Sequence, residues 1–161
     1  MQYVYLNRPR RFGKSVLIDT LQAYFEGRRE LFEGLRIMEL ETDWVSRPVI
    51  RLDMSRGGAD AASIRSYLDL AFSRYETKYS VTVRPNSSLA SRFDSIILAA
   101  YEQTGKQVAI LVDEYDSPLQ HSWHTPEHEA CTALYREVFA ILKADDDRQP
   151  QGRGTCSGTR Q

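Results

Sequence analysis

A run of five apolar residues in the second half of the chain most constrains the fold. Residues 108–112 read Val-Ala-Ile-Leu-Val, and the run ends abruptly in Asp113, Glu114, Tyr115 and Asp116. A continuous, partly β-branched run of this length is typical of a strand buried on both faces of a parallel sheet. Carboxylates at the C-terminal end of such a strand lie in the crevice where open α/β sheets bind ligands. The segment therefore predicts an α/β fold with a ligand site at this strand end.

The rest of the chain alternates between strand-like and helix-like segments. Further strands are expected over residues 3–6 and 49–54, and helices over about 14–26, 60–79, 89–104 and 126–143, with a short helical turn and connector within 31–46. Gly27 and Gly105 are expected to end the first and third helices, and Thr125-Pro126 to begin the last. This alternation predicts a mainly parallel sheet with helices on both faces.

A Gly-Lys-Ser triplet, Gly13 to Ser15, stands between the first predicted strand and the first predicted helix. Backbone N–H groups at a helix N-terminus face phosphates, a Lys ammonium reaches the β and γ oxygens, and a Ser hydroxyl ligates Mg²⁺. Lys14 and Ser15 would have these roles. The full phosphate-loop pattern has a glycine five residues before the second one, where this chain has Arg8. Taken alone, the triplet fits a basic surface loop before a helix equally well.

Three residues just before the triplet extend the predicted phosphate contact. Arg10, Arg11 and Phe12 precede Gly13 directly, and the arginines add positive charge beside the loop. A solvated loop is the alternative explanation for this basic cluster, and its adjacency to Gly13 favours the phosphate-facing one. We therefore expect Arg10, Arg11 and Phe12 to contact the nucleotide together with the triplet.

The acidic residues after 108–112 complete a predicted site for phosphoryl transfer. In such sites the first acid after the strand helps to hold Mg²⁺, and an adjacent Glu polarises the attacking water. This assigns Asp113 to the metal and Glu114 to the water. An acidic cluster after a strand is otherwise often a solvated turn, and Ser117-Pro118 is ordinary turn chemistry. The combination with Lys14 favours a site for a purine nucleotide.

Bulk properties narrow the class of protein. The chain has 161 residues, enough for one domain with a core, and its net charge of −1 argues against a generally basic nucleic-acid binder. No apolar stretch approaches the length of a membrane span, and no N-terminal signal segment is recognisable. The two cysteines suggest no disulfide framework, so a cytoplasmic location is expected.

Three histidines lie close together before the last predicted helix. His121, His124 and His128 offer zinc-binding side chains, but their spacing fits neither a helical nor a finger pattern, and no paired cysteines accompany them. Solvated loop histidines are therefore the preferred explanation.

The chain resembles the bacterial family of predicted AAA-type ATPases (AAA-ATPase-like), within the P-loop NTPases. The resemblance rests on residues 8–15 (Arg-Pro-Arg-Arg-Phe-Gly-Lys-Ser), 24–27 (Tyr-Phe-Glu-Gly), 31–35 (Leu-Phe-Glu-Gly-Leu) and 112–118 (Val-Asp-Glu-Tyr-Asp-Ser-Pro), and covers about residues 3–144. It implies a three-layer αβα P-loop domain over 1–144 that binds ATP with Mg²⁺ and hydrolyses it. In this family Arg8 in place of the first glycine is normal. Members are often fused to a nuclease-like domain of the PD-(D/E)XK type, which makes DNA or that domain an expected partner.

The resemblance also implies a missing strand. Family members usually continue after the last helix with an apolar strand, which lies between the phosphate-loop strand and the acid-bearing strand. Here residues 145–161 carry no aliphatic or aromatic side chain, so a disordered tail and an incomplete sheet are expected. Three hypotheses follow: an ATPase, a nucleotide-gated module that binds DNA or protein with little turnover, and a gene fragment without function. An incomplete sheet would leave backbone groups unpaired, and a poorly soluble or partly folded chain is then expected.

Overall fold

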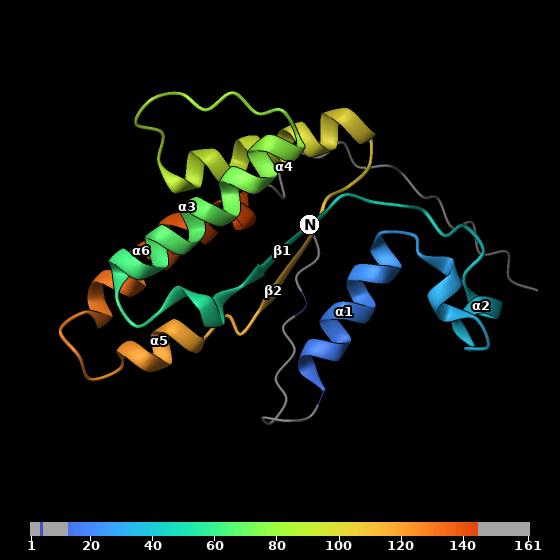
Figure 1. Cartoon of the computed structure of the whole chain (residues 1–161), viewed down its shortest axis with the longest axis horizontal. Coiled ribbons are helices and arrows are strands. Elements are labelled where there is room, and N and C mark those ends of the chain that lie inside the picture. The colour runs from blue at the N-terminus through green and yellow to red at the C-terminus, as the bar shows by residue number, and fades with distance from the viewer. Residues whose placement is uncertain (1–3, 5–12, 145–161) are drawn as a thin grey trace, which may run out of the picture.

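The computed structural model describes residue 4 and residues 13–144, which form six α-helices, two 3₁₀ helices and two strands (Figure 1). In chain order these elements are α1 (Lys14–Phe25), η1 (Arg29–Phe32), α2 (Ile37–Leu40), β1 (Val49–Asp53), η2 (Met54–Gly57), α3 (Ala61–Lys78), α4 (Leu89–Thr104), β2 (Ala109–Asp113), α5 (Ser117–Ser122) and α6 (His128–Ala144). The predicted helices and two of the predicted strands are therefore present, with ends that agree within two residues.

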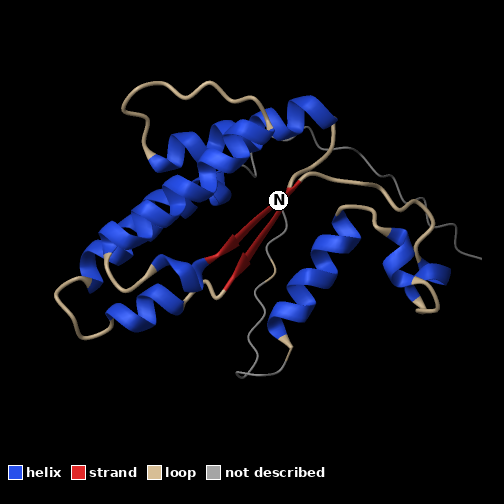
Figure 2. Cartoon of the chain, viewed as in Figure 1, coloured by secondary structure: helices blue, strands red, loops and turns tan. Residues whose placement is uncertain are grey.

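The two strands form a small parallel sheet (Figure 2). Their register pairs Val49 with Ala109 at one end and Asp53 with Asp113 at the other. Parallel strands joined through helices are the arrangement expected of an α/β fold, so this part of the prediction is confirmed. Because the strands run in the same direction, both aspartates lie at the same end of the sheet, where the strands finish.

One face of the sheet carries the main core. Ile50 and Leu52 are fully buried there, and α3, α4 and α6 cover them on one side of the strand pair (Figure 1). The rings of Phe72 and Phe93 stack at 5.0 Å between α3 and α4. A strand places alternate side chains on opposite faces, so the paired residues Arg51 and Leu111 point to the other side.

Helix α1 covers that second face. Arg51 reaches it from β1: its Nη1 donates to Asp19 Oδ1 at 2.5 Å and to Gln22 Oε1 at 3.1 Å. Among the residues of α1 only Ala23 is buried, so apolar packing contributes little to holding this helix. The polar contacts of Arg51 are therefore important for the position of α1 on the sheet.

Two tyrosines of α3 close the outer edge of β1. The hydroxyl of Tyr75 accepts the N–H of Arg51 at 2.7 Å and donates to its C=O at 3.1 Å. The hydroxyl of Tyr67 accepts the N–H of Asp53 at 2.8 Å. An edge strand normally exposes these groups to pairing with another strand. Here helix α3 satisfies them.

Local signals explain most helix ends. Asp60 and Ser88 accept the N–H groups of Ser63 and Ser91, so each caps the N-terminus of its helix, α3 and α4. Gly105 ends α4 in the left-handed region with φ of 62°, as the sequence predicts. The ends of these long helices are thus encoded locally.

The segment after β2 differs from the prediction. Ser117-Pro118 starts the short helix α5 instead of a turn, since proline fits the first turn of a helix. Thr125 does not cap α6. Its hydroxyl donates to the C=O of Ser122 at 2.6 Å, and α6 begins only at His128.

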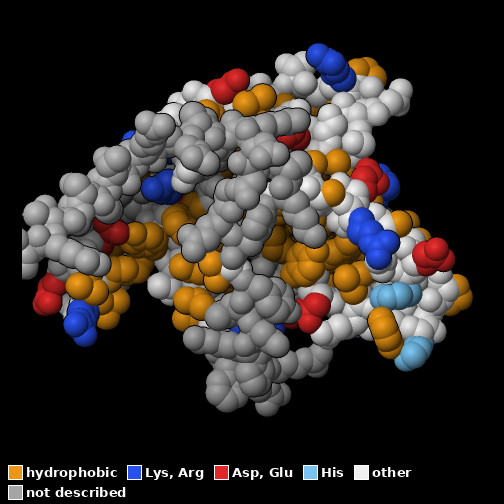
Figure 3. Space-filling model, turned by 180° about the vertical axis from the view of Figure 1, so that it is seen from behind, with side chains coloured by type: hydrophobic (Ala, Val, Ile, Leu, Met, Phe, Trp, Pro, Cys, Tyr) orange, Lys and Arg blue, Asp and Glu red, His pale blue; other side chains and the backbone are white. Residues whose placement is uncertain are grey.

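The expectation of solvated loop histidines is also only partly right. His121 lies in α5 and His128 in α6, and their Nδ1 atoms lie within 3.3 Å of the hydroxyls of Ser117 and Ser122. His124 is in a loop and packs against Trp123. Histidines gather with a hydrophobic side chain at one edge of the face seen in Figure 3. Within residues 13–144 no three His, Cys, Asp or Glu side chains gather as a metal site would require.

Several predictions fall outside the described residues. These are the tail 145–161 and the strand 3–6, of which only Val4 is described. Among the described residues, no helix combines the length and the apolar character that a membrane crossing requires.

Candidate active site

The first half of the site is the start of α1. Gly13 has φ of 68° and ψ of 25°, in the left-handed region where glycine is favoured, and its C=O accepts the N–H of Leu17 at 3.0 Å. The chain therefore enters the helix at Lys14, and the free N–H groups of the first turn point out of its end. Ser15 is exposed in that first turn.

The second half is the turn after β2. Asp113 Oδ1 accepts the N–H of Glu114 at 3.0 Å, and the C=O of Glu114 accepts the N–H of Ser117 at 2.9 Å. Glu114 has φ of 50°, which is uncommon for a residue other than glycine. These two hydrogen bonds hold Glu114 in that conformation, directly before α5.

The two halves meet at an ion pair. Lys14 Nζ lies 3.6 Å from Glu114 Oε1, and the two side chains are 26% and 40% exposed. A pair this exposed contributes less than about 1 kcal/mol, so it does little for stability. It does bring together two residues that lie a hundred positions apart in the sequence and that sequence reasoning assigns to one site.

Asp113 is 7% exposed and lies beside Asp53 in the sheet register. The carboxylate of Asp53 serves its own loop: Oδ1 accepts the hydroxyl of Ser55 at 2.6 Å, and Oδ2 lies 3.2 Å from Arg56 Nε. The two aspartates thus have different environments at the same end of the sheet, and Asp113 is the one that adjoins Glu114.

Tyr115 packs the turn after β2, which contains Asp113 and Glu114, against the core. Its ring packs edge-on against Tyr135 and Phe139 of α6, with centroids 5.3 and 5.2 Å away. Burial raises the pKa of the Tyr115 phenol. Because Tyr115 follows Glu114 directly, this packing limits how far the Glu114 backbone can move.

The donor set near this turn suits magnesium better than zinc. Mg²⁺ is usually held by one or two carboxylates together with water and substrate phosphates, and a Ser hydroxyl serves as a ligand in phosphate loops. Asp113 offers a nearly buried carboxylate, and Ser15 offers an exposed hydroxyl on the neighbouring helix. The residues fit the ion that the sequence predicts.

The predicted site residues are only partly described. Gly13, Lys14, Ser15, Asp113 and Glu114 lie in the described part of the chain, and Lys14 and Glu114 are in contact. The predicted nucleotide contacts Arg10, Arg11 and Phe12 lie outside it. Sequence reasoning missed the support that Arg51 gives to α1. A lone arginine within an otherwise apolar strand was the available signal.

Comparison with known proteins places this chain in a family. The family described as "Predicted AAA-ATPase" matches residues 1–150, and the chain belongs to it. An uncharacterized protein in the vnfD 5' region of Azotobacter chroococcum mcd 1 is 33% identical over 148 residues, which is 89% of this chain and 28% of that protein. The chain thus spans less than a third of this relative's length. No solved structure matches.

Proposed function

We propose that residues 1–144 form a P-loop ATPase domain with a three-layer αβα arrangement, which binds ATP with Mg²⁺ and hydrolyses it. The observation that carries the proposal is the 3.6 Å approach of Lys14 Nζ to Glu114 Oε1, between the first turn of α1 and the end of β2. A helix N-terminus with a lysine, next to carboxylates at a strand end, provides both halves of a phosphoryl-transfer site. Membership in the predicted AAA-ATPase family supports it.

Each residue has one role in this proposal. The Lys14 ammonium and the N–H groups of the first turn of α1, with Arg10, Arg11 and Phe12, hold the phosphates of ATP. Ser15 and Asp113 would hold Mg²⁺, which shields the phosphate charge when bound. Glu114 accepts a proton from water while the water oxygen bonds to the γ-phosphorus and the bond to the β-phosphate oxygen breaks. The products are ADP and inorganic phosphate.

The ion pair has a consequence for this mechanism. Glu114 Oε1 lies 3.6 Å from Lys14 Nζ, so a phosphate that binds at Lys14 competes with the Glu114 carboxylate for the ammonium. The Lys14 ammonium and the Glu114 carboxylate then separate as the γ-phosphate binds to Lys14. Glu114 becomes available to water only once Lys14 has a new anionic partner.

The experiment is a comparison of Glu114→Gln with wild type. Glutamine cannot accept a proton, so Mg-ATP binding should persist while turnover falls by at least about a hundredfold. Glu102→Gln, an exposed acid of α4, is the matched control and should keep the wild-type rate. Turnover of Glu114→Gln at the wild-type rate would remove Glu114 from the role of base.

The proposal includes a partner for the ATPase domain. The chain spans 28% of the length of its relative. As the family resemblance implies, we propose a nuclease-like domain acting on DNA as the partner. The buried free thiol of Cys131 fits a reducing, cytoplasmic compartment. If DNA increases ATP turnover by the longer protein, it supports this context. If turnover stays near zero while ATP changes DNA affinity, a nucleotide-gated binding module is the better description.

A further inference from the structure

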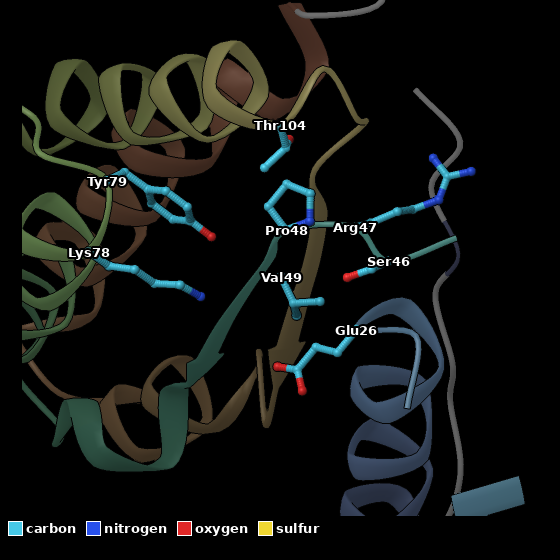
Figure 4. A pocket seen from close by; sticks show the side chains of 8 residues that line it. All are labelled: Glu26, Ser46, Arg47, Pro48, Val49, Lys78, Tyr79 and Thr104. Carbon is cyan, nitrogen blue, oxygen red and sulfur yellow. The ribbon is translucent and has the colours of Figure 1, made fainter. Parts of the chain in front are cut away.

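A cavity lies at the end of α1 opposite Lys14. Its volume is about 290 Å³, and its walls come from the end of α1, the start of β1 and the C-terminal ends of α3 and α4 (Figure 4). Lys14 and Glu26 stand at opposite ends of a helix that rises about 1.5 Å per residue, so the cavity is separate from the candidate active site.

The clearest sign of a ligand is the hydroxyl of Tyr79. The residue is 5% exposed, and its hydroxyl oxygen is buried without a hydrogen-bond partner within the described part of the chain. Figure 4 shows this hydroxyl pointing into the space in front of Val49. Tyr67 and Tyr75, on the same helix, use their hydroxyls on the backbone of β1. A buried hydroxyl without a hydrogen-bond partner is unfavourable, so a ligand atom that accepts a hydrogen bond from the Tyr79 hydroxyl would stabilise this site.

Backbone geometry adds a second donor. Along β1 the N–H groups of Arg51 and Asp53 point to the outer edge, where the two tyrosines accept them. Backbone groups alternate in direction with a period of two residues, which places the N–H of Val49 on the same edge. Val49 lines the cavity. The N–H of Val49 and the hydroxyl of Tyr79 therefore face the same space.

The charge of Lys78 favours an anion at the cavity. The Lys78 ammonium points into the same space and lies 5.1 Å from the centre of the Tyr79 ring, whereas the guanidinium of Arg47 points away from it (Figure 4). Among the described residues no carboxylate lies within ion-pair distance of Lys78. The acid of the wall, Glu26, has a cation beside it: its Oε2 makes no hydrogen bond within the described residues but lies 2.5 Å from Arg28 Nη2, and its Oε1 accepts from Gln22 Nε2 at 2.8 Å.

The helix end does not compete for the Lys78 charge. The last carbonyls of α3 already accept N–H groups: Tyr75 from Tyr79 at 2.9 Å, and Glu76 from Val81 at 2.9 Å. Pro48, the Val49 side chain and the Tyr79 ring form apolar parts of the wall, and Ser46 and Thr104 complete it. The cavity thus combines a cation and two neutral donors with an apolar surface.

We propose that this cavity binds a small organic acid, with the carboxylate between Lys78, the Tyr79 hydroxyl and the Val49 N–H. A carboxylate has two oxygens and about four acceptor positions, enough to accept from all three of these donor groups. The apolar body of the acid lies against Pro48 and the Tyr79 ring. The volume is at the lower end of the range for small-molecule sites, which restricts the ligand to about the size of a substituted benzoate.

An NMR titration of the ¹⁵N-labelled chain with benzoate tests the proposal. The Val49 amide should shift and saturate with benzoate, and should stay in place with benzamide, which has the same ring but no charge. Tyr79→Phe removes only the hydroxyl and should weaken benzoate binding about fivefold, and Lys78→Gln about tenfold. Lys106→Gln, an exposed lysine outside the cavity, is the control and should bind as wild type.

Four results would overturn the proposal: an unmoved Val49 amide, equal responses to benzoate and benzamide, wild-type affinity in Tyr79→Phe, or tighter binding of phenyl phosphate than of benzoate. The last would assign the site to phosphate esters rather than carboxylates. Amide dispersion like that of the wild type shows that each variant is folded. ATP binding has no part in the readout, so the result is independent of the proposed ATPase function.

Discussion

Arg51 of β1 and Asp19 of α1 are joined by an ion pair of 2.5 Å that fixes the helix carrying Lys14 to the strand beside Asp113. The contact is partly exposed, with 31% of the Arg51 side chain and 61% of the Asp19 side chain accessible. Its contribution to stability is therefore below about 1 kcal/mol. Its consequence is positional, because Ala23 is the only buried residue of α1 and apolar packing therefore does little to orient the helix on the sheet.

Replacement of Arg51 with methionine should affect ATP binding more than folding. We expect the melting temperature to fall by at most about 4 °C, while Mg-ATP affinity drops about threefold or more because the start of α1 is less well held. Arg74→Met, on an exposed position of α3, is the control. Unchanged affinity in Arg51→Met would show that α1 keeps its place without this contact.

The tyrosines at the outer edge of β1 give a prediction on stability. Tyr75→Phe leaves the N–H of Arg51 without its acceptor and should lower the free energy of unfolding by about 1–3 kcal/mol. Tyr101→Phe removes a hydroxyl from a side chain that is 38% exposed and should have almost no effect. Urea denaturation of both variants measures the difference. Equal stability of the two would mean that water replaces the Tyr75 hydroxyl without cost.

The ion pairs of Arg92 give the largest expected loss. Arg92 of α4 is 13% exposed and donates through Nε to Glu76 Oε1 at 2.6 Å, and it also pairs with Asp69. Arg92→Met would leave the Glu76 carboxylate unpaired among apolar side chains, a loss of about 3 kcal/mol or more. Arg65→Met breaks an exposed pair with Glu137 at 3.8 Å and should cost less than about 1 kcal/mol. Calorimetry of both variants would refute the account if the two losses were the same.

Long, periodic helices were predictable from the sequence because their apolar spacing and end signals are local. The Asp60 cap and Gly105 belong to α3 and α4 themselves, and the predicted ends lie within two residues of the observed ones. The helix α5 was not predictable in this way. It has six residues, too few to show a period, and its Ser-Pro start has the composition of a turn.

The sequence predicts the candidate site only through its motif residues. The triplet at Lys14 and the acids after β2 indicated one site, and the structure brings Lys14 and Glu114 into contact. The contacts that hold the candidate site in place join residues far apart in the sequence. The contacts of Arg51 with α1 and of Tyr115 with α6 join segments far apart in the chain, so no pattern within either segment encodes them.

The expectation of a missing strand makes a prediction for β2. Its odd-numbered residues pair with β1, so the N–H groups of Ile110 and Val112 face the opposite edge. If that edge has no strand partner, these two amides should exchange with solvent much faster than those of Leu111 and Asp113. Hydrogen exchange followed by NMR measures this directly. Equal protection of all four would mean that another segment completes the sheet.

The most direct test of the proposed function is the affinity of the 161-residue chain for Mg-ATP, measured by calorimetry on wild type and Lys14→Ala. The alanine removes the ammonium that pairs with Glu114 and leaves the main core and the sheet untouched. We predict saturable binding by the wild type and a loss of at least about a hundredfold in Lys14→Ala, with an unchanged melting temperature. No Mg-ATP binding by the wild type, or equal binding by both proteins, would contradict the assignment of this site to a nucleotide.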